Sequence, residues 1–116
     1  MNRNFRLRQS NDVKRVRRFG RSYAHPLVVL VVLAAQEGTS RFGVIAGRSV
    51  GNAVQRNRAK RRIREALRNL MPQVKPGWNV IAISRKPIQQ ATFIEIKDCL
   101  CQLLSKAGLL EVSHGS

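Results

Sequence analysis

The sequence predicts one small α/β domain of the two-layer α+β kind, with elements in the order helix, strands, helix, strand, helix. The chain has 116 residues, 43% of them hydrophobic, which is the size of one domain with one modest core. A continuous Val-rich run is typical of a buried strand, and a longer segment has apolar residues at helical spacing. We find no internal repeat or linker that would separate two domains.

The first predicted helix runs from about Asp12 to Phe19. Polar residues suited to an N-cap precede it at positions 10–12, and Gly20 follows it as a C-cap. We expect this short, basic helix to pack through Val13 and Val16.

The next segment contains the first strands. Residues 21–25 are predicted to be a short extended piece, and the apolar run Leu27–Ala35 is too continuous for a strand that faces water, so we expect it to be a buried central strand. Residues 36–40 are typical of a turn. Arg41–Gly47 has the pattern of a second strand and is predicted to close a hairpin.

The longest helical pattern covers Asn52–Met71. Its apolar side chains fall within a sector of about 100° when residues are placed at helical intervals. They are Ala59, Ile63, Ala66, Leu67 and Leu70. Asn52 is a suitable N-cap, Pro72 is expected to stop the helix, and most of its remaining residues are basic.

A turn at 75–77, a strand at Trp78–Ser84 and an amphipathic helix at Thr92–Leu104 complete the predicted domain. Cys99 and Cys101 lie in this last helix, where a separation of two residues turns them about 200° apart. They can neither form a disulfide with each other nor share a metal ion there. We therefore expect one core thiol and one surface thiol.

The N-terminus and the apolar runs predict a cytoplasmic protein without a membrane partner. The longest apolar run has nine residues, well short of the roughly 20 needed to cross a bilayer. No apolar segment of the secretory type follows the N-terminal residues.

The charge of the chain is strongly positive and unevenly distributed. Lys and Arg number 22 against 6 Asp and Glu, for a formal net charge of +16. Residues 1–68 hold 17 of the basic side chains and three of the acidic ones. This distribution predicts a polyanionic partner that binds mainly to the first 68 residues.

The segment 51–68, GNAVQRNRAKRRIREALR, carries the strongest functional pattern. Its helix has seven cations and one acid, Glu65. Like charges four residues apart destabilise a helix by a few tenths of a kcal/mol each, and a bound anion relieves that repulsion. Solvated surfaces usually mix both signs, so the pattern indicates polyanion binding. Arginine outnumbers lysine six to one in this helix, which favours structured RNA because guanidinium groups fork onto phosphates and stack on bases.

The triplet Arg56-Asn57-Arg58, with Gly51 before it and the basic run after it, resembles the signature helix of the bacterial ribonuclease P protein subunit. The resemblance extends in the same order to other segments. These are Arg6-Leu7, the helix at 12–20, Phe42-Gly43-Val44 leading into Arg48, and residues 81–87. It covers nearly the whole chain, so we expect the domain to comprise residues 1–110 and residues 111–116 to be a short tail.

This resemblance implies the order αβββαβα, with a mixed four-stranded sheet and the basic helix in a left-handed crossover, a hand found in very few such connections. It also implies that an RNA subunit is the catalyst, with Mg²⁺ ions bound mainly by RNA and no organic cofactor. The holoenzyme would remove the 5′ leader of precursor tRNA by phosphodiester hydrolysis. The protein would be an accessory subunit, inactive alone and monomeric in a 1:1 complex with the RNA.

The resemblance further implies two RNA-binding surfaces. The predicted contacts to the catalytic RNA are Arg48, Asn52, Arg56, Asn57, Arg58, Lys60, Arg61, Arg62, Arg64 and Arg68. A cleft between the first helix and the sheet would hold the leader, with predicted contacts at Arg6, Val13, Arg15, Arg17, Arg18, Phe19, Tyr23 and Val31.

The leader cleft of this family commonly presents aromatic side chains, but the corresponding positions here are Val13, Arg17 and Val31. Base stacking would then require Phe19 or Tyr23. The plainer interpretation of Phe19, as of the other aromatic residues Phe42, Trp78 and Phe93, is packing in the core.

Two other classes of function are weighed against this one. A ribosomal or nucleoid protein that binds RNA or DNA without processing it would explain the charge, but not the Arg-Asn-Arg helix in its surrounding order. A protein nuclease would need converging carboxylates, whereas the six acids are scattered and only Glu95 and Asp98 are close in helical spacing, as a solvated face would place them. His25 and His114 have no nearby catalytic partner in sequence. The sequence therefore predicts neither a catalytic nor a metal-binding residue.

Overall fold

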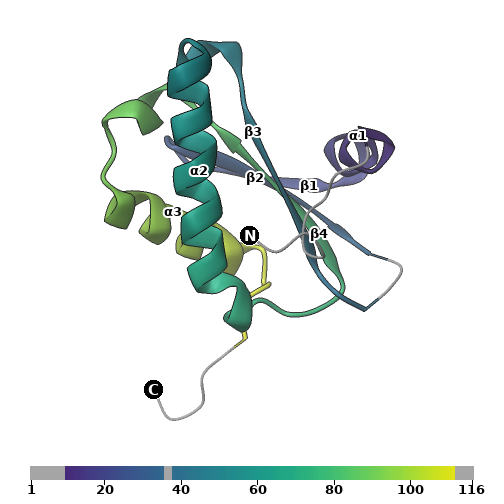
Figure 1. The fold of residues 1–116 in the computed structure, drawn as a ribbon. Helices are drawn as coiled ribbons and strands as arrows, with labels where there is room; N and C mark the ends of the chain where they lie inside the picture. The colour runs from purple at the N-terminus through teal and green to yellow at the C-terminus, as the bar shows by residue number, and fades with distance from the viewer. Residues whose placement is uncertain (1–9, 36–37, 112–116) are drawn as a thin grey trace.

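The computed structural model describes residues 10–35 and 38–111, and the predictions for Arg6 and His114 lie outside these ranges. The described chain forms seven regular elements in the order αβββαβα, as the resemblance implies (Figure 1). They are α1 (Ser10–Phe19), β1 (Arg21–Ala24), β2 (Val28–Ala34), β3 (Arg41–Ala46), α2 (Ala53–Leu70), β4 (Trp78–Ser84) and α3 (Phe93–Lys106). Short 3-10 helices η2 (Arg48–Val50), η3 (Met71–Gln73) and η4 (Lys86–Gln90) lie in the connections.

The four strands form one mixed sheet in the order β1-β2-β4-β3. β2 pairs antiparallel with β1 and with β4, and β3 pairs parallel with β4. The predicted hairpin between 27–35 and 41–47 is therefore wrong. β4, which is apolar on both faces, takes the central place between β2 and β3, and α2 forms the crossover that makes β3 and β4 parallel. The handedness of that crossover stays a prediction.

The two faces of the sheet carry different helices. Leu30 of β2 is level with Ala82 of β4, and this face meets α2 and α3 in the main core. Val31 of β2 and Ile81 of β4 are also paired with each other and lie on the opposite face of the sheet, where Val16 of α1 covers them. Figure 1 shows α1 on one side of the sheet and α2 and α3 on the other.

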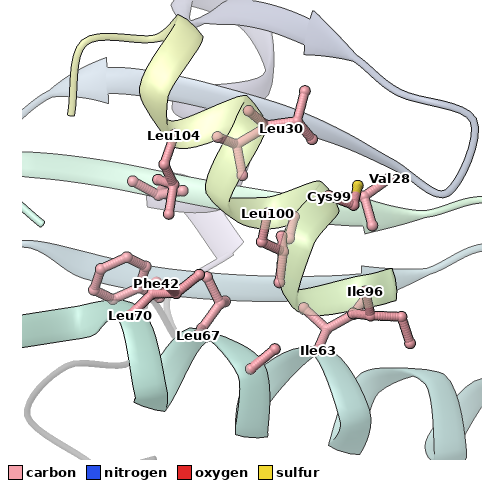
Figure 2. Packing of buried hydrophobic residues seen from close by; sticks show 14 of the residues in the cluster. Val28, Leu30, Phe42, Ile63, Leu67, Leu70, Ile96, Cys99, Leu100 and Leu104 are labelled. Carbon is pink, nitrogen blue, oxygen red and sulfur yellow. The ribbon is translucent and has the colours of Figure 1, made fainter. Parts of the chain in front are cut away.

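The main core confirms the apolar stripe predicted for α2. All five predicted side chains, Ala59, Ile63, Ala66, Leu67 and Leu70, are buried. Side chains from α2, α3 and the strands point toward one another (Figure 2). Each large aliphatic side chain buried in this way contributes about 1.5–3 kcal/mol.

The two cysteines also lie as predicted, since Cys99 is buried in the core and Cys101 is partly exposed. Burial raises the pKa of the Cys99 thiol to about 11. The core thiol is therefore neutral over the physiological pH range.

Both long helices begin with a capping box. The Asn52 side chain accepts a hydrogen bond from the backbone N–H of Gln55, whose side chain accepts one from the backbone N–H of Asn52. Thr92 and Glu95 make the same reciprocal pair at the start of α3. Gly51, just before the first box, has φ +141°, and a Cβ there would collide with the Gln55 side chain.

The first helix docks closely on the sheet through Val16, which is 1% exposed. Gly20 makes the close approach possible, because a Cβ at this position would lie 2.4 Å from the carbonyl oxygen of Val16 and 2.8 Å from that of Val32. At the other end of the chain, the backbone N–H groups of Lys75 and Glu111 donate to the carbonyls of Leu109 and Gln73. None of the helices within the described ranges combines the length and the apolar character that a membrane span requires.

Candidate nucleic-acid interface

The outward side of α2 carries a continuous polar and basic stripe. Asn57, Arg61, Arg64 and Arg68 follow one another at intervals of four, three and four residues, which places them on one side of the helix, opposite the buried stripe. Asn57, Arg61 and Arg68 are exposed, and Arg64 is half-buried. We call these four residues the outer stripe.

Other predicted contacts flank the outer stripe. Arg58 is exposed on one side of it, and Lys60 is half-buried on the other. Arg56 is half-buried in the first turns of α2, close to the exposed cap residue Asn52, and Arg48 is exposed on η2. The structure thus places the predicted residues of 48–68 on α2 and on the segment just before it, which includes η2.

Arg62 and Arg68 make contacts within the chain that bear on this surface. The Arg62 guanidinium leaves the basic surface and donates to the backbone carbonyls of Ile88 and Ala91. Burial, and after it the charge of Arg58, lowers the pKa of this guanidinium from its ordinary value. Arg68 pairs with Glu65 at 2.7 Å between Nη2 and Oε1. This pair is exposed, so its contribution to stability is at most about 0.5 kcal/mol and it leaves Arg68 accessible.

On the opposite side of the molecule, α1 presents a second basic surface that includes an aromatic ring. Arg15, Arg17 and Arg18 are exposed, and the Arg18 guanidinium carbon lies 5.3 Å from the centroid of the Phe19 ring. Phe19 is 65% exposed, so its expected place in the core is wrong. Val16 already fills the position of α1 that faces the sheet, and Phe19, the last residue of the helix and about 60° from Val16 around it, remains exposed.

Three further aromatic residues were expected to pack in the core, and they do. Phe42 is buried in the main core, and Trp78 and Phe93 are partly buried against it. Their predicted packing role is confirmed.

Two residues predicted for the leader surface lie elsewhere. Val31 is 4% exposed because α1 covers it. Tyr23 is paired with Leu30, so it belongs to the opposite face of the sheet and packs against the main core. A strand places successive side chains on alternate faces, and Tyr23 and Val31 therefore cannot line the same surface in this register.

The sequence reasoning missed four apolar side chains on the α1 side of the sheet. They are Val29, Leu33, Ile45 and Ile83, all only partly buried around α1. With the partly buried Val13 of α1 they form the surface that we call the α1-side apolar face. Val29 and Leu33 differ from Val31 by two positions in β2, and Ile83 differs from Ile81 by two in β4, which is the signal that would have identified these three. Ile45 belongs to β3 and is paired with Ile83.

The acidic residues and histidines of the described chain are dispersed or serve local roles. Within the described part of the chain no cluster brings together three or more His, Cys, Asp or Glu side chains. Hydrogen bonds with the backbone and then the side chain of Thr92 lower the pKa of Glu95, which serves as a helix cap. The Nδ1 atom of His25 accepts a hydrogen bond from the backbone N–H of Leu27 at 3.1 Å.

The fold and these surfaces define a class: a small, strongly basic α+β domain with an arginine-rich helix at its surface. The sequence matches the model of the family described as Ribonuclease P over residues 1–108. The ribonuclease P protein component of Herpetosiphon aurantiacus is 43% identical over 109 residues, which cover 94% of this chain and 89% of the relative. That of Symbiobacterium thermophilum is 41% identical over 112 residues, covering 96% and 97%.

Solved structures agree with these relatives. The RNase P protein of Staphylococcus aureus superposes with a TM-score of 0.83 at 27% identity, covering 92% of this chain and 98% of the other. The RNase P protein of Thermotoga maritima gives 0.79 at 27% identity, covering 87% and 96%.

The chain belongs to the ribonuclease P protein family. It is the protein component of ribonuclease P, an accessory subunit of an RNA-based, metal-dependent endoribonuclease, and it assists the maturation of tRNA 5′ ends. Its partner is the ribonuclease P RNA.

Proposed function

We propose that the outer stripe of α2 and the flanking cations bind phosphates of the catalytic RNA. The observation that carries this proposal is the arrangement of α2 itself: its buried stripe fixes the helix on the core and leaves the outer stripe facing outward. Guanidinium groups held on a rigid helix lose little conformational freedom when they pair with phosphates. Their charge offsets repulsion between RNA strands, which otherwise requires bound cations.

We propose that the 5′ leader of precursor tRNA binds on the other side of the sheet, along α1 and the α1-side apolar face. The exposed ring of Phe19 supports this assignment, because exposed aromatic side chains are platforms on which single-stranded bases stack. Arg15, Arg17 and Arg18 on the same helix would hold the leader phosphates. Val31 and Tyr23 are left out of this surface.

The complex proposed here contains one protein monomer per RNA and acts in the cytoplasm. Mg²⁺ is assigned mainly to the RNA, because the enzyme of this family is RNA-based and metal-dependent. No step of the hydrolysis is assigned to a side chain of the protein.

The experiment that tests this function is cleavage of a precursor tRNA by the cognate ribonuclease P RNA at low Mg²⁺ concentration. The reaction is run with the RNA alone, with the protein alone and with both. We expect cleavage to be stimulated only when both are present, and the stimulation to decline when Arg58 and Arg61 are both changed to Gln. Cleavage by the protein alone, or no stimulation of the RNA, would overturn the proposal.

A further inference from the structure

Among the basic residues of α2, Arg62 is directed toward another part of the chain. Its Nη1 atom donates to the carbonyl of Ile88 at 3.5 Å, and its Nη2 atom donates to the carbonyl of Ala91. These carbonyls lie near the end of η4 and just before the cap of α3. The side chain therefore joins the middle of α2 to the connection between β4 and α3.

A second polar link joins the same two segments. The Nε2 atom of Gln55 donates to Oε1 of Gln89 in η4 at 3.3 Å. Gln55 and Arg62 are seven residues apart, so they lie within about 20° of each other around α2 and two turns apart along it. Both reach η4 from one edge of the buried stripe, and together they fix η4 at two points along the helix.

The connection held by these links is itself part of the core. Ile88 is 0% exposed and Ala91 is 9% exposed. The Ile88 carbonyl also accepts the backbone N–H of Ala91, whereas the Ala91 carbonyl lies outside helices and strands and needs a donor from elsewhere. A guanidinium can serve both acceptors with one rigid fork. Lysine, with a single ammonium on a flexible stem, is a poorer match for two carbonyls.

The engagement of Arg62 distinguishes it from Arg58, one turn earlier on the same helix. Arg58 is exposed, whereas Arg62 is half-buried against η4. To bind a phosphate with the same fork, Arg62 would have to abandon both carbonyls. Ile88 would keep the backbone N–H of Ala91 as its donor, whereas the Ala91 carbonyl would lose the donor that Arg62 supplies.

We propose that Arg62 is a positioning residue that clamps the η4–α3 connection to α2 and thereby holds the RNA-binding helix in place, rather than a phosphate ligand of the RNA. The clamp is a property of the free protein. The proposal rests on the proposed function of α2 in one respect, namely the comparison of Arg62 with the arginines that are proposed to bind phosphates.

The test compares Arg62→Gln with the matched control Arg58→Gln in the full-length chain. Hydrogen exchange of backbone amides in residues 86–92 is measured below the melting temperature. We expect Arg62→Gln to accelerate exchange in this segment selectively, and to lower Tm by roughly 4–8 °C, the shift that the loss of one net hydrogen bond produces in a domain near this size. Arg58→Gln should change neither quantity. A purely global destabilisation would instead accelerate exchange across the whole core.

Binding to the ribonuclease P RNA as a function of salt concentration provides the second readout. Arg58→Gln should lower the slope of log K against log salt by about one, and Arg62→Gln should leave the slope unchanged even where affinity falls. A slope lowered by Arg62→Gln, with unchanged exchange at 86–92, would overturn the clamp and leave the proposed function of α2 intact. An unchanged slope for Arg58→Gln would count against Arg58 as an RNA contact without affecting the clamp.

The conservative variant Arg62→Lys keeps the test decisive if the glutamine variant does not fold. It retains the charge but loses the fork. We expect faster exchange at 86–92 than in Arg58→Lys, and equal exchange in the two variants would overturn the proposal.

Discussion

Around α2, the role of each basic side chain depends on its angle from the buried stripe. Arg61 and Arg64 lie opposite Ile63 and Ala66 and extend outward, whereas Arg62 lies beside the stripe and reaches a neighbouring segment of the chain. A change of one residue along a helix is a turn of about 100°, so adjacent arginines of the same run meet different surroundings.

The replacement Arg61→Gln removes one predicted phosphate contact from the outer stripe. We expect weaker binding to the ribonuclease P RNA and a reduction of about one in the salt slope, because one fewer phosphate is neutralised. Lys106→Gln, at an exposed position in the last turn of α3, is the control and should leave the slope unchanged. Equal slopes for Arg61→Gln and the unmodified protein would remove Arg61 from the interface.

Phe19→Ala tests the proposed leader surface. The exposed ring contributes little to folding, so Tm should change little, whereas stacking on a leader base is worth roughly 1–3 kcal/mol, or about 5- to 150-fold in affinity. The loss should be measured with the holoenzyme on a precursor tRNA with a long leader. A substrate with a single leader nucleotide serves as the control and should bind equally to both proteins. An equal loss on both substrates would place Phe19 outside the leader surface.

At the scale of elements, local hydrogen bonds determine where α2 and α3 begin. Each helix starts with a capping box in which a polar cap and the third helical residue satisfy two backbone donors. A capping box depends on only a few consecutive residues, which explains why the helix starts at Asn52 and Thr92 can be predicted from the sequence.

The cap of α3 gives the stability of the protein a dependence on acidic pH. The pKa of Glu95 is lowered in the folded state, so its ionised form contributes stability above the pKa of the unfolded chain. That contribution disappears as the pH falls through the lowered pKa. Glu95→Gln keeps a capping side chain but cannot titrate, and we therefore expect a shallower loss of Tm between about pH 5 and 3. Asp98→Asn is the control on the same helix. If both variants lost Tm equally between about pH 5 and 3, the cap of α3 would not be the source of the acid dependence.

At the scale of the whole molecule, the net charge of +16 opposes compaction. An anion that binds the folded surface more tightly than the unfolded chain stabilises the fold, by about 2.7 kcal/mol at a concentration 100 times its Kd. We expect millimolar pyrophosphate to raise Tm more than chloride at the same ionic strength. The rise should be smaller in an Arg61→Gln, Arg64→Gln double variant. Equal shifts with the two anions would indicate general screening instead of binding.

The whole molecule also determines where the two proposed RNA-binding surfaces lie, which is on opposite sides of one sheet. α2 and α3 bury one face of the sheet, and α1 covers only part of the other, which leaves Val29 and Ile83 partly exposed beside it. The sheet thus separates the proposed site for the catalytic RNA from the proposed site for the leader.

The sequence by itself determined the features that depend on neighbouring residues. The period of the buried stripe of α2, the capping residues, the limits of β4 and the basic helix could all be predicted, because each arises from interactions within a few turns or along one strand. The order of the elements followed from these patterns.

Only the tertiary structure decided which segments meet. β4 lies between β2 and β3 although β3 precedes it in the chain. The register of β1 with β2 pairs Tyr23 with Leu30 and so places Tyr23 and Val31 on opposite faces. Arg62 finds its acceptors in a segment 26 and 29 residues away. Contacts over such separations depend on how whole elements pack, and the residues that make them carry no local pattern that would reveal them.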